Sequence, residues 1–202
     1  MKKTSKALLL TICAVLLVAA SVMGTMAYLT STDKVENTFT VGKVAITLDE
    51  AKVDEAGKVI EGADRVDGNT YKLMPGHTYT KDPTVHVEAG SENSWIFVKV
   101  ENGISAFEAA TAGTYKNITD QITANGWTKL TDVDGVDNVY YREYTGSAAA
   151  ELKVFENFKV ADNANAVSGW STLEAKVIVT AYAVQKDGFD TAAAAWAVAS
   201  TN

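Results

Sequence analysis

The chain contains 202 residues, of which 47% are hydrophobic and 21% are charged, and its formal net charge is −7. This composition is typical of a globular domain and excludes an intrinsically disordered chain. Lys2, Lys3 and Lys6 lie at the very start, so the remainder carries −10 once these three charges are subtracted from −7. A body this acidic repels nucleic acid and anionic lipid, and we expect neither as a partner.

The first 27 residues have the three parts of a secretory signal peptide. The basic stretch Met1–Lys6 precedes the uncharged apolar run Ala7–Met23, and Thr25-Met26-Ala27 places small residues at both specificity positions of a cleavage site. This arrangement is typical of exported proteins. We expect residues 1–27 to form a signal-peptide helix that is cleaved between Ala27 and Tyr28. The sequence therefore predicts a secreted protein that meets the membrane only through its uncleaved signal segment.

An uncleaved membrane anchor is the alternative interpretation, because an apolar run of 17 residues lies at the lower limit for spanning a bilayer. A lipoprotein would be anchored at Cys13, but the bulky Ile12 precedes it and the apolar run continues past it. Cys13 is the only cysteine of the chain. The cleaved protein would therefore have no thiol and no disulfide.

The rest of the chain has mainly the patterns of β-strands. Short apolar or alternating segments are separated by turn residues such as Pro75-Gly76, Ala89–Asn93 and Asp134-Gly135. The expected strands are Phe39–Leu48, Thr78–Val87, Trp95–Val100, Trp127–Leu130, Val139–Tyr144, Leu152–Phe158 and Leu173–Val184, the last of them long and buried. Two short helices are expected, over Tyr115–Ala124 and over the alanine-rich tail Thr191–Ala199. This pattern predicts an all-β protein built as a β-sandwich.

Three segments allow finer predictions. In Trp95–Val100 the even-numbered residues face one side of the sheet and the odd-numbered residues face the other. Pro83 must occupy an edge or bulge position within Thr78–Val87, because proline cannot donate to a ladder of hydrogen bonds. The polar stretch Ala51–Asn69 predicts a hairpin or loop with little to bury.

His77 and His86 are the only histidines, and they are the first candidates for a metal site. They would face each other only if the chain folded back at Lys81-Asp82, and they would point to opposite faces if it ran straight. A zinc site needs at least a third ligand, and the sequence has no HExxH motif. Surface histidines on a strand are the preferred interpretation.

Asp132, Asp134 and Asp137 resemble a calcium loop in composition. The spacing does not complete a twelve-residue EF-hand loop, and no glutamate closes it. A solvated turn is the preferred interpretation, with calcium as a weak alternative. We therefore predict no cofactor.

No motif for an enzyme is complete. The sequence contains no GxSxG elbow and no phosphate-binding glycine loop. Carboxylate pairs such as Glu50 and Asp54 lie in a polar stretch that offers nothing apolar to shift a pKa. Tryptophans could line a sugar-binding face, but they are more often part of a core, as we expect for Trp95, while Trp170 stays open. We expect no catalytic residue.

Four parts of the chain carry motifs that recur in one group of proteins. They are a cleavage region with an aromatic residue after the cut (Gly24–Thr30), a first strand (Val35–Val44), a Pro-Gly turn with the strand after it (Leu73–Gly76, Thr80–Pro83, Val85–Val87, Gly90-Ser91) and a closing segment (Lys176–Val184, Gly188-Phe189, Trp196). Together they resemble the TasA/camelysin group of Gram-positive exported proteins, whose precursors are processed by a signal peptidase of the SipW type. Residues 103–170 carry none of these motifs.

The resemblance implies a jelly-roll-like β-sandwich over residues 39–202 and a fibre-forming protein of the biofilm matrix or cell surface. In that group the N-terminal segment of one subunit adds as a strand to the next. Carried over by position, the donor lies within the N-terminal segment 28–38, and Tyr28, Leu29 and Val35 are its anchoring side chains. The implied partners are the SipW-type peptidase and copies of the same chain or related matrix subunits.

Two other functions compete with this expectation. Camelysin-type members are metalloendopeptidases, which would require zinc at His77 or His86, but the chain has no complete zinc motif. A surface adhesin would bind a host protein or glycan through exposed aromatic residues. A structural, non-enzymatic role is the leading prediction.

Overall fold

The structure is a computed structural model that describes residues 6, 8, 10–19, 42–173 and 176–201. The chain divides into two units, Met1–Thr40 and Val41–Asn202. All described residues of the first unit are helical. Within the described ranges, no helix has both the length and the hydrophobicity needed to cross a membrane. The predicted cleavage site at Ala27 and Tyr28 and the predicted donor segment lie outside the described residues.

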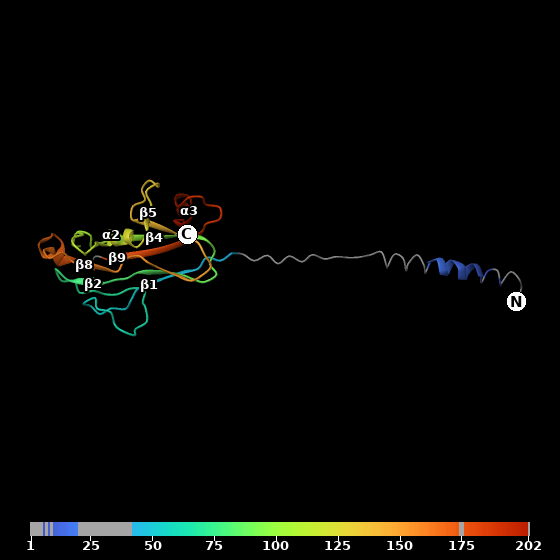
Figure 1. Cartoon of the computed structure of the whole chain (residues 1–202), viewed down its shortest axis with the longest axis horizontal. Coiled ribbons are helices and arrows are strands. Elements are labelled where there is room, and N and C mark those ends of the chain that lie inside the picture. Colours follow the sequence, from blue (N-terminus) through green and yellow to red (C-terminus); the bar gives the residue numbers. More distant parts are fainter. Residues whose placement is uncertain (1–5, 7, 9, 20–41, 174–175, 202) are drawn as a thin grey trace. The chain divides into compact units, whose positions relative to one another are not determined.

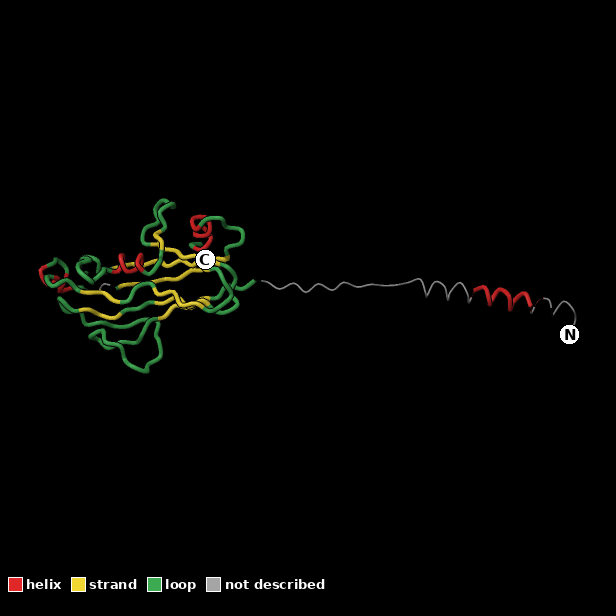
Figure 2. The backbone as a smooth tube through the Cα atoms, in the orientation of Figure 1, coloured by secondary structure: helices red, strands yellow, loops and turns green. Residues whose placement is uncertain are grey.

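The second unit consists mainly of antiparallel strands, which confirms the all-β prediction (Figures 1 and 2). A three-stranded sheet has the order β1 (Ile46–Asp49), β3 (Thr84–Val87), β7 (Ala150–Lys153), and a two-stranded sheet pairs β2 (Thr78–Thr80) with β8 (Asn157–Lys159). A four-stranded sheet has the order β5 (Thr128–Lys129), β6 (Val139–Tyr144), β4 (Ser94–Asn102), β9 (Val177–Gln185).

The two smaller sheets form one interrupted layer. Lys81 N–H donates to Glu156 O over 3.1 Å, and Val154 N–H donates to Pro83 O over 2.8 Å, so backbone bonds continue across the gap between the sheets. The expected strands Thr78–Val87 and Leu152–Phe158 are therefore each divided in two. The first division falls at Pro83, for which the sequence predicted an edge or bulge position.

The main core lies between this layer and the four-stranded sheet. It combines Tyr79, Val85, Leu152 and Phe158 from the first layer with Ile96, Val98, Val100 and Tyr140 from the second. The C-terminal helix α3 (Ala192–Ala199) lies on the other face of the four-stranded sheet (Figure 1). There Trp95, Phe97 and Val139 pack against its Ala195 and Trp196. Alternate residues of β4 thus enter two different cores, as the sequence predicted.

Both expected helices are present, and each begins at a polar cap. Helix α2 (Ile118–Ala124) starts after Asn117, whose side chain accepts from Asp120 N–H, so its first helical residue lies later than predicted. Helix α3 (Ala192–Ala199) starts after Thr191, whose hydroxyl accepts from Ala194 N–H. Two short 3₁₀ turns, η1 (Ala164–Ala166) and η2 (Trp170–Thr172), precede β9.

Two sequence expectations need correction. Residues 42–45 do not belong to β1, which begins only at Ile46. Strand β9 is half-buried along most of its length rather than fully buried, and its Ile178 is 45% exposed. The reason is positional, because β9 pairs with β4 alone among the described strands and loses cover on one side.

The loop after β1 buries little, as expected. Within Ala51–Asn69 only Val53 and Gly57 are buried. Gly57 has a φ of +77°, and a Cβ at this position would lie 2.7 Å from Tyr79 Cα. Glycine therefore lets the loop lie directly on β2.

Candidate functional site

Strands β1 and β9 are edge strands of the two layers. Among the described strands, β1 pairs only with β3, and β9 pairs only with β4. The core residues Leu48 of β1 and Val179 of β9 pack against the same cluster between the layers. The two edges approach each other without backbone pairing among the described residues, and together they form the candidate site.

Backbone hydrogen bonds define which groups of β9 face the open side. Gly103 N–H donates to Lys176 O over 2.9 Å, and Lys186 N–H donates to Asn93 O over 2.7 Å. The β4–β9 register is unbroken, so hydrogen-bonded pairs recur at every second residue and the even-numbered residues of β9 bond to β4. The odd-numbered residues of β9 direct their N–H and C=O groups to the open edge.

Only a short part of the β1 edge is open, as its backbone hydrogen bonds show. Glu88 N–H donates to Ala45 O over 3.0 Å, which places the odd-numbered residues of β1 in hydrogen-bonded pairs with β3. Leu48 directs its backbone groups the other way. Two positions later Glu50 exchanges two backbone hydrogen bonds of 2.8 Å with Val66, so the loop covers the edge from there on.

A groove of about 610 Å³ lies between the two edges. Its apolar surface comes from both layers and from the loops beside them, through Leu48, Tyr71, Leu73, Ile104, Phe158, Val177 and Val179. Charged and polar groups line it as well, among them Asp49, Glu50, Asp67, Asn69, Lys81 and Lys176. An apolar groove beside an unpaired strand edge suits an extended peptide, which can bond to the edge and place alternate side chains in the groove.

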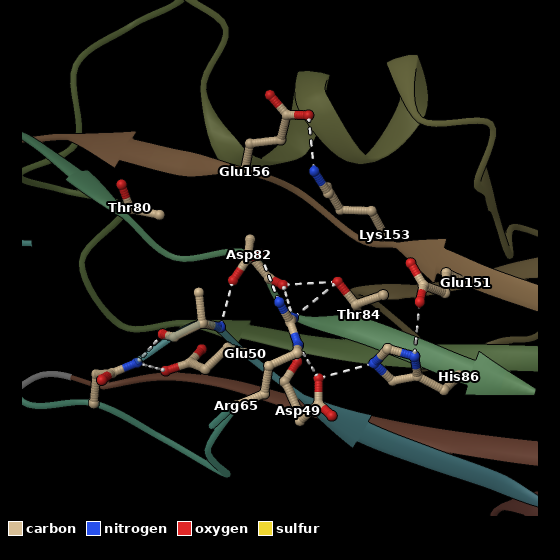
Figure 3. A network of polar contacts seen from close by, with 12 residues as sticks. Asp49, Glu50, Arg65, Thr80, Asp82, Thr84, His86, Glu151, Lys153 and Glu156 are labelled. Carbon is tan, nitrogen blue, oxygen red and sulfur yellow. Dashed lines mark hydrogen bonds and ion pairs between the residues drawn. The ribbon is translucent and has the colours of Figure 1, made fainter. Parts of the chain in front are cut away.

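Arg65 fastens the 51–69 loop onto the outer surface of the three-stranded sheet (Figure 3). Its guanidinium is ion-paired with Asp49 at the end of β1 and, over 3.1 Å, with Asp82 before β3. It also donates to Thr84 Oγ1 over 3.2 Å. One side chain thus ties the loop to both β1 and β3.

Arg65 and His86 both favour the charged form of Asp49. Burial alone would raise its pKa, but hydrogen bonds from Arg65 and His86, together with the charges of those groups, lower the pKa below its ordinary value of 3.8. His86 Nε2 lies 2.9 Å from Asp49 Oδ1, and His86 Nδ1 lies 3.8 Å from Glu151 Oε1 (Figure 3). The ionised carboxylate therefore links β1, β3 and the loop.

A second polar cluster at the groove wall joins Glu50, Lys81 and Asn69. Lys81 Nζ donates to Glu50 Oε2 over 2.5 Å, and the side chains of this pair are 11% and 4% exposed. Asn69 Nδ2 donates to the other carboxylate oxygen, Oε1, over 2.9 Å. Glu50 was expected to lie in a polar stretch with nothing apolar around it, but it is 3% exposed and lines the groove together with Leu48 and Tyr71.

Tyr71 lies at the same wall and remains a neutral phenol. Burial raises its pKa, and the negative charge of Glu50 raises it further. Its hydroxyl donates to Thr80 O over 3.0 Å, and its ring packs edge-on against Tyr79 and Phe158. Tyr71 therefore supplies apolar surface to the groove rather than an ionised group.

The structure does not bring the histidines together. His77 is exposed in the turn before β2, whereas His86 is half-buried on β3. Strand β2 pairs with β8 and β3 pairs with β7, so the chain does not fold back at Lys81-Asp82. Among residues 42–173 and 176–201, no three His, Cys, Asp or Glu side chains are grouped so that they could hold a metal ion.

The remaining candidates lie apart from the groove. Asp132, Asp134 and Asp137 are all exposed, in the loop between β5 and β6. Trp95 is buried in the core beneath α3, as predicted, and Trp170 is half-buried against Phe107. Neither tryptophan lines the groove.

Sequence reasoning missed the groove and both polar clusters. Lys81 and Glu50 are 31 positions apart, and His86 and Asp49 are 37 positions apart, so no local pattern connects them. The available signal was Pro83, which predicted an interruption beside Lys81 and Asp82. It did not indicate what the interruption contacts.

Comparisons of the chain with protein-family models, with curated proteins and with solved structures find no match. The functional assignment therefore depends on the groove, the strand edges and the sequence itself.

Proposed function

We propose that the chain is a secreted structural protein of the extracellular matrix or cell surface, whose subunits assemble head to tail by strand addition. The N-terminal segment Tyr28–Val35 of one copy adds to the open edge of β9 in the next copy and fills the groove between β9 and β1. This is the assembly mode implied by the TasA/camelysin resemblance. Processing by a SipW-type peptidase and a jelly-roll-like strand order belong to the same proposal.

The observation that carries the proposal is the open edge of β9 beside an apolar groove. The odd-numbered residues from Val177 to Gln185 direct their backbone N–H and C=O groups away from β4. Two of them, Val177 and Val179, also line the groove. An apolar strand edge that pairs with no other described strand is an aggregation hazard that proteins normally cover or charge. Its presence therefore supports a role as a binding surface.

The sequence of the donor segment fits one face of such a groove. In an extended strand alternate side chains point the same way, so Leu29 and Val35 would share a face and could enter the groove together. Between them Ser31 and Asp33 would lie on the same face, where Lys176 lines the groove. Tyr28 would point to the opposite side.

Cleavage after Ala27 gives the assembly its direction and its timing. Before cleavage, the donor is continuous with the apolar segment 7–23 and is not available as a free N-terminus. After cleavage, each copy offers one donor and one acceptor edge. This contact is heterologous and does not close on itself, so it produces a fibre.

Electron microscopy of the chain starting at Tyr28 tests the proposal, with a version lacking Tyr28–Val35 beside it. We expect fibres from the first protein and single globular particles from the second. Single particles from both would contradict self-assembly and favour a surface adhesin that binds a different partner.

A further inference from the structure

Glu50 holds a lysine and an asparagine side chain on its two carboxylate oxygens. Lys81 Nζ donates to Oε2 over 2.5 Å, and Asn69 Nδ2 donates to Oε1 over 2.9 Å. The Lys81 and Glu50 side chains are 11% and 4% exposed. A potential amine nucleophile and a carboxamide are therefore hydrogen-bonded to the two oxygens of one buried acid, and such proximity is a requirement for reaction between them.

The carboxamide of Asn69 is fixed and polarised by the loop backbone. Its Oδ1 accepts from Val53 N–H over 2.9 Å, and its Nδ2 donates to Ala51 O over 2.8 Å as well as to Glu50. A backbone N–H on the carbonyl oxygen stabilises negative charge that develops there during attack at the carbon. The leaving nitrogen, Asn69 Nδ2, is hydrogen-bonded to Glu50, the acid that could protonate it.

We propose that Lys81 and Asn69 form an intramolecular amide cross-link, with Glu50 as the catalytic acid and base. Glu50 accepts a proton from the Lys81 ammonium group, and the neutral Nζ attacks Cγ of Asn69. The negative charge on Oδ1 is held by Val53 N–H. Glu50 then donates its proton to the leaving nitrogen, the Cγ–Nδ2 bond breaks, and a new Cγ–Nζ bond remains. Ammonia leaves and takes up the second proton of Nζ as ammonium, so no oxidant or cofactor is needed.

The surroundings provide an exit for the product. Glu50, Asn69 and Lys81 all line the groove between β1 and β9, which connects them with solvent. Tyr71 and Phe158 line the same groove and supply apolar surface beside the buried acid.

The cross-link would join the end of the 51–69 loop to the interruption between β2 and β3. These are places where regular strand pairing is absent, so a covalent bond there would replace missing ladder hydrogen bonds. Cys13 is the only cysteine, so no disulfide can fasten this loop. The inference does not depend on whether the protein assembles.

Tryptic digestion of the denatured full chain, followed by mass spectrometry, tests the cross-link directly. Without it, trypsin releases residues 66–72, which contain Asn69, and cuts after Lys81 to release residues 73–81. With it, Lys81 is not cleaved, and residues 66–72 remain joined to residues 73–99 with a mass one ammonia below the sum of the two peptides. We expect the joined product, and complete release of the two free peptides would overturn the proposal.

Variants then test each role. Lys81→Arg and Glu50→Gln should both abolish the joined peptide, and its persistence in Glu50→Gln would overturn the catalytic role of Glu50. Lys153→Arg is the matched control, because Lys153 forms an ion pair with Glu156 at the surface, where its side chain is 45% exposed. It should retain the joined peptide. Loss of ammonia by cyclisation of Asn69 alone would survive Lys81→Arg, so a mass loss that persists there would contradict the cross-link.

Discussion

Strands β4 and β9 lie side by side, contain nine residues each and are both rich in apolar residues, yet their environments differ. Strand β4 pairs with β6 on one edge and β9 on the other, and most of its residues are buried. Strand β9 pairs with β4 alone among the described strands, and most of its residues are half-buried. Two strands of similar apolar composition therefore differ in burial because one is paired on both edges and the other on one edge only.

The difference in pairing between β4 and β9 also distinguishes a structural region of the domain from a binding region. The two cores on either face of β4 fix the four-stranded sheet between the other layer and α3. The edge of β9 instead keeps apolar side chains and backbone groups directed toward a groove. We interpret β4 as the element that stabilises the domain and β9 as the element that binds the next subunit.

Truncation of core side chains should give the largest difference between the two strands. Phe97 of β4 is 0% exposed, and Phe97→Ala should lower the free energy of unfolding by about 3–5 kcal/mol through lost burial and a cavity. Ile178 of β9 is 45% exposed, and Ile178→Ala should change it by about 0.5 kcal/mol or less. Urea denaturation monitored by tryptophan fluorescence measures both. Equal losses would break the comparison.

Proline scanning along β9 should produce a smaller, alternating effect. Thr180 is even-numbered and its N–H bonds to β4, whereas the N–H of Val179 points to the open edge. The free energy of unfolding should therefore be lower for Thr180→Pro than for Val179→Pro by about 1–3 kcal/mol, the cost of leaving a backbone carbonyl of β4 without its donor. Thermal unfolding of the two variants compares them. A reversed order would contradict the assignment of the open edge.

The smallest expected effect concerns the Arg65 ion pairs at the β1 edge. Because the pKa of Asp49 is lowered in the folded protein, its contribution to stability is present above pH 3.8 and is lost as the pH falls through the folded-state pKa. Asp49 and Arg65 are partly exposed, so Asp49→Asn should cost less than about 1 kcal/mol at pH 7. Unfolding curves at pH 7 and pH 3 should differ less for Asp49→Asn than for the original chain. An unchanged difference would show that Asp49 does not carry this pH dependence.

Local patterns predicted the features that depend on neighbouring residues. Alternation in Trp95–Val100 predicted the two faces of β4, and the helical pattern over Tyr115–Ala124 predicted the end of α2. Pro83 predicted an interruption but not the division of one strand between two sheets.

Features set by distant parts of the chain could not be predicted in this way. Burial of Glu50 depends on Lys81, and the half-exposure of β9 depends on which strands pair with its edges. Neither property is recorded in a local window of sequence. The candidate site is built almost entirely from such contacts, and this explains why the fold was predicted better than the site.

A mixing experiment between two disabled subunits tests the central claim most directly. One protein lacks Tyr28–Val35 and can only accept a strand. The other starts at Tyr28 and carries Val179→Lys, which places a charge in the groove and blunts the acceptor edge, so it can only donate. Val198→Lys, at an exposed position on α3, is the control for the added charge and should leave fibre formation intact.

Analytical ultracentrifugation of the two proteins, alone and mixed, gives the answer. We expect monomers from each protein alone and a one-to-one dimer from the mixture that grows no further, because the dimer has neither a free donor nor an open acceptor. Monomers in the mixture, with both proteins folded by circular dichroism, would contradict strand addition at the β9 edge.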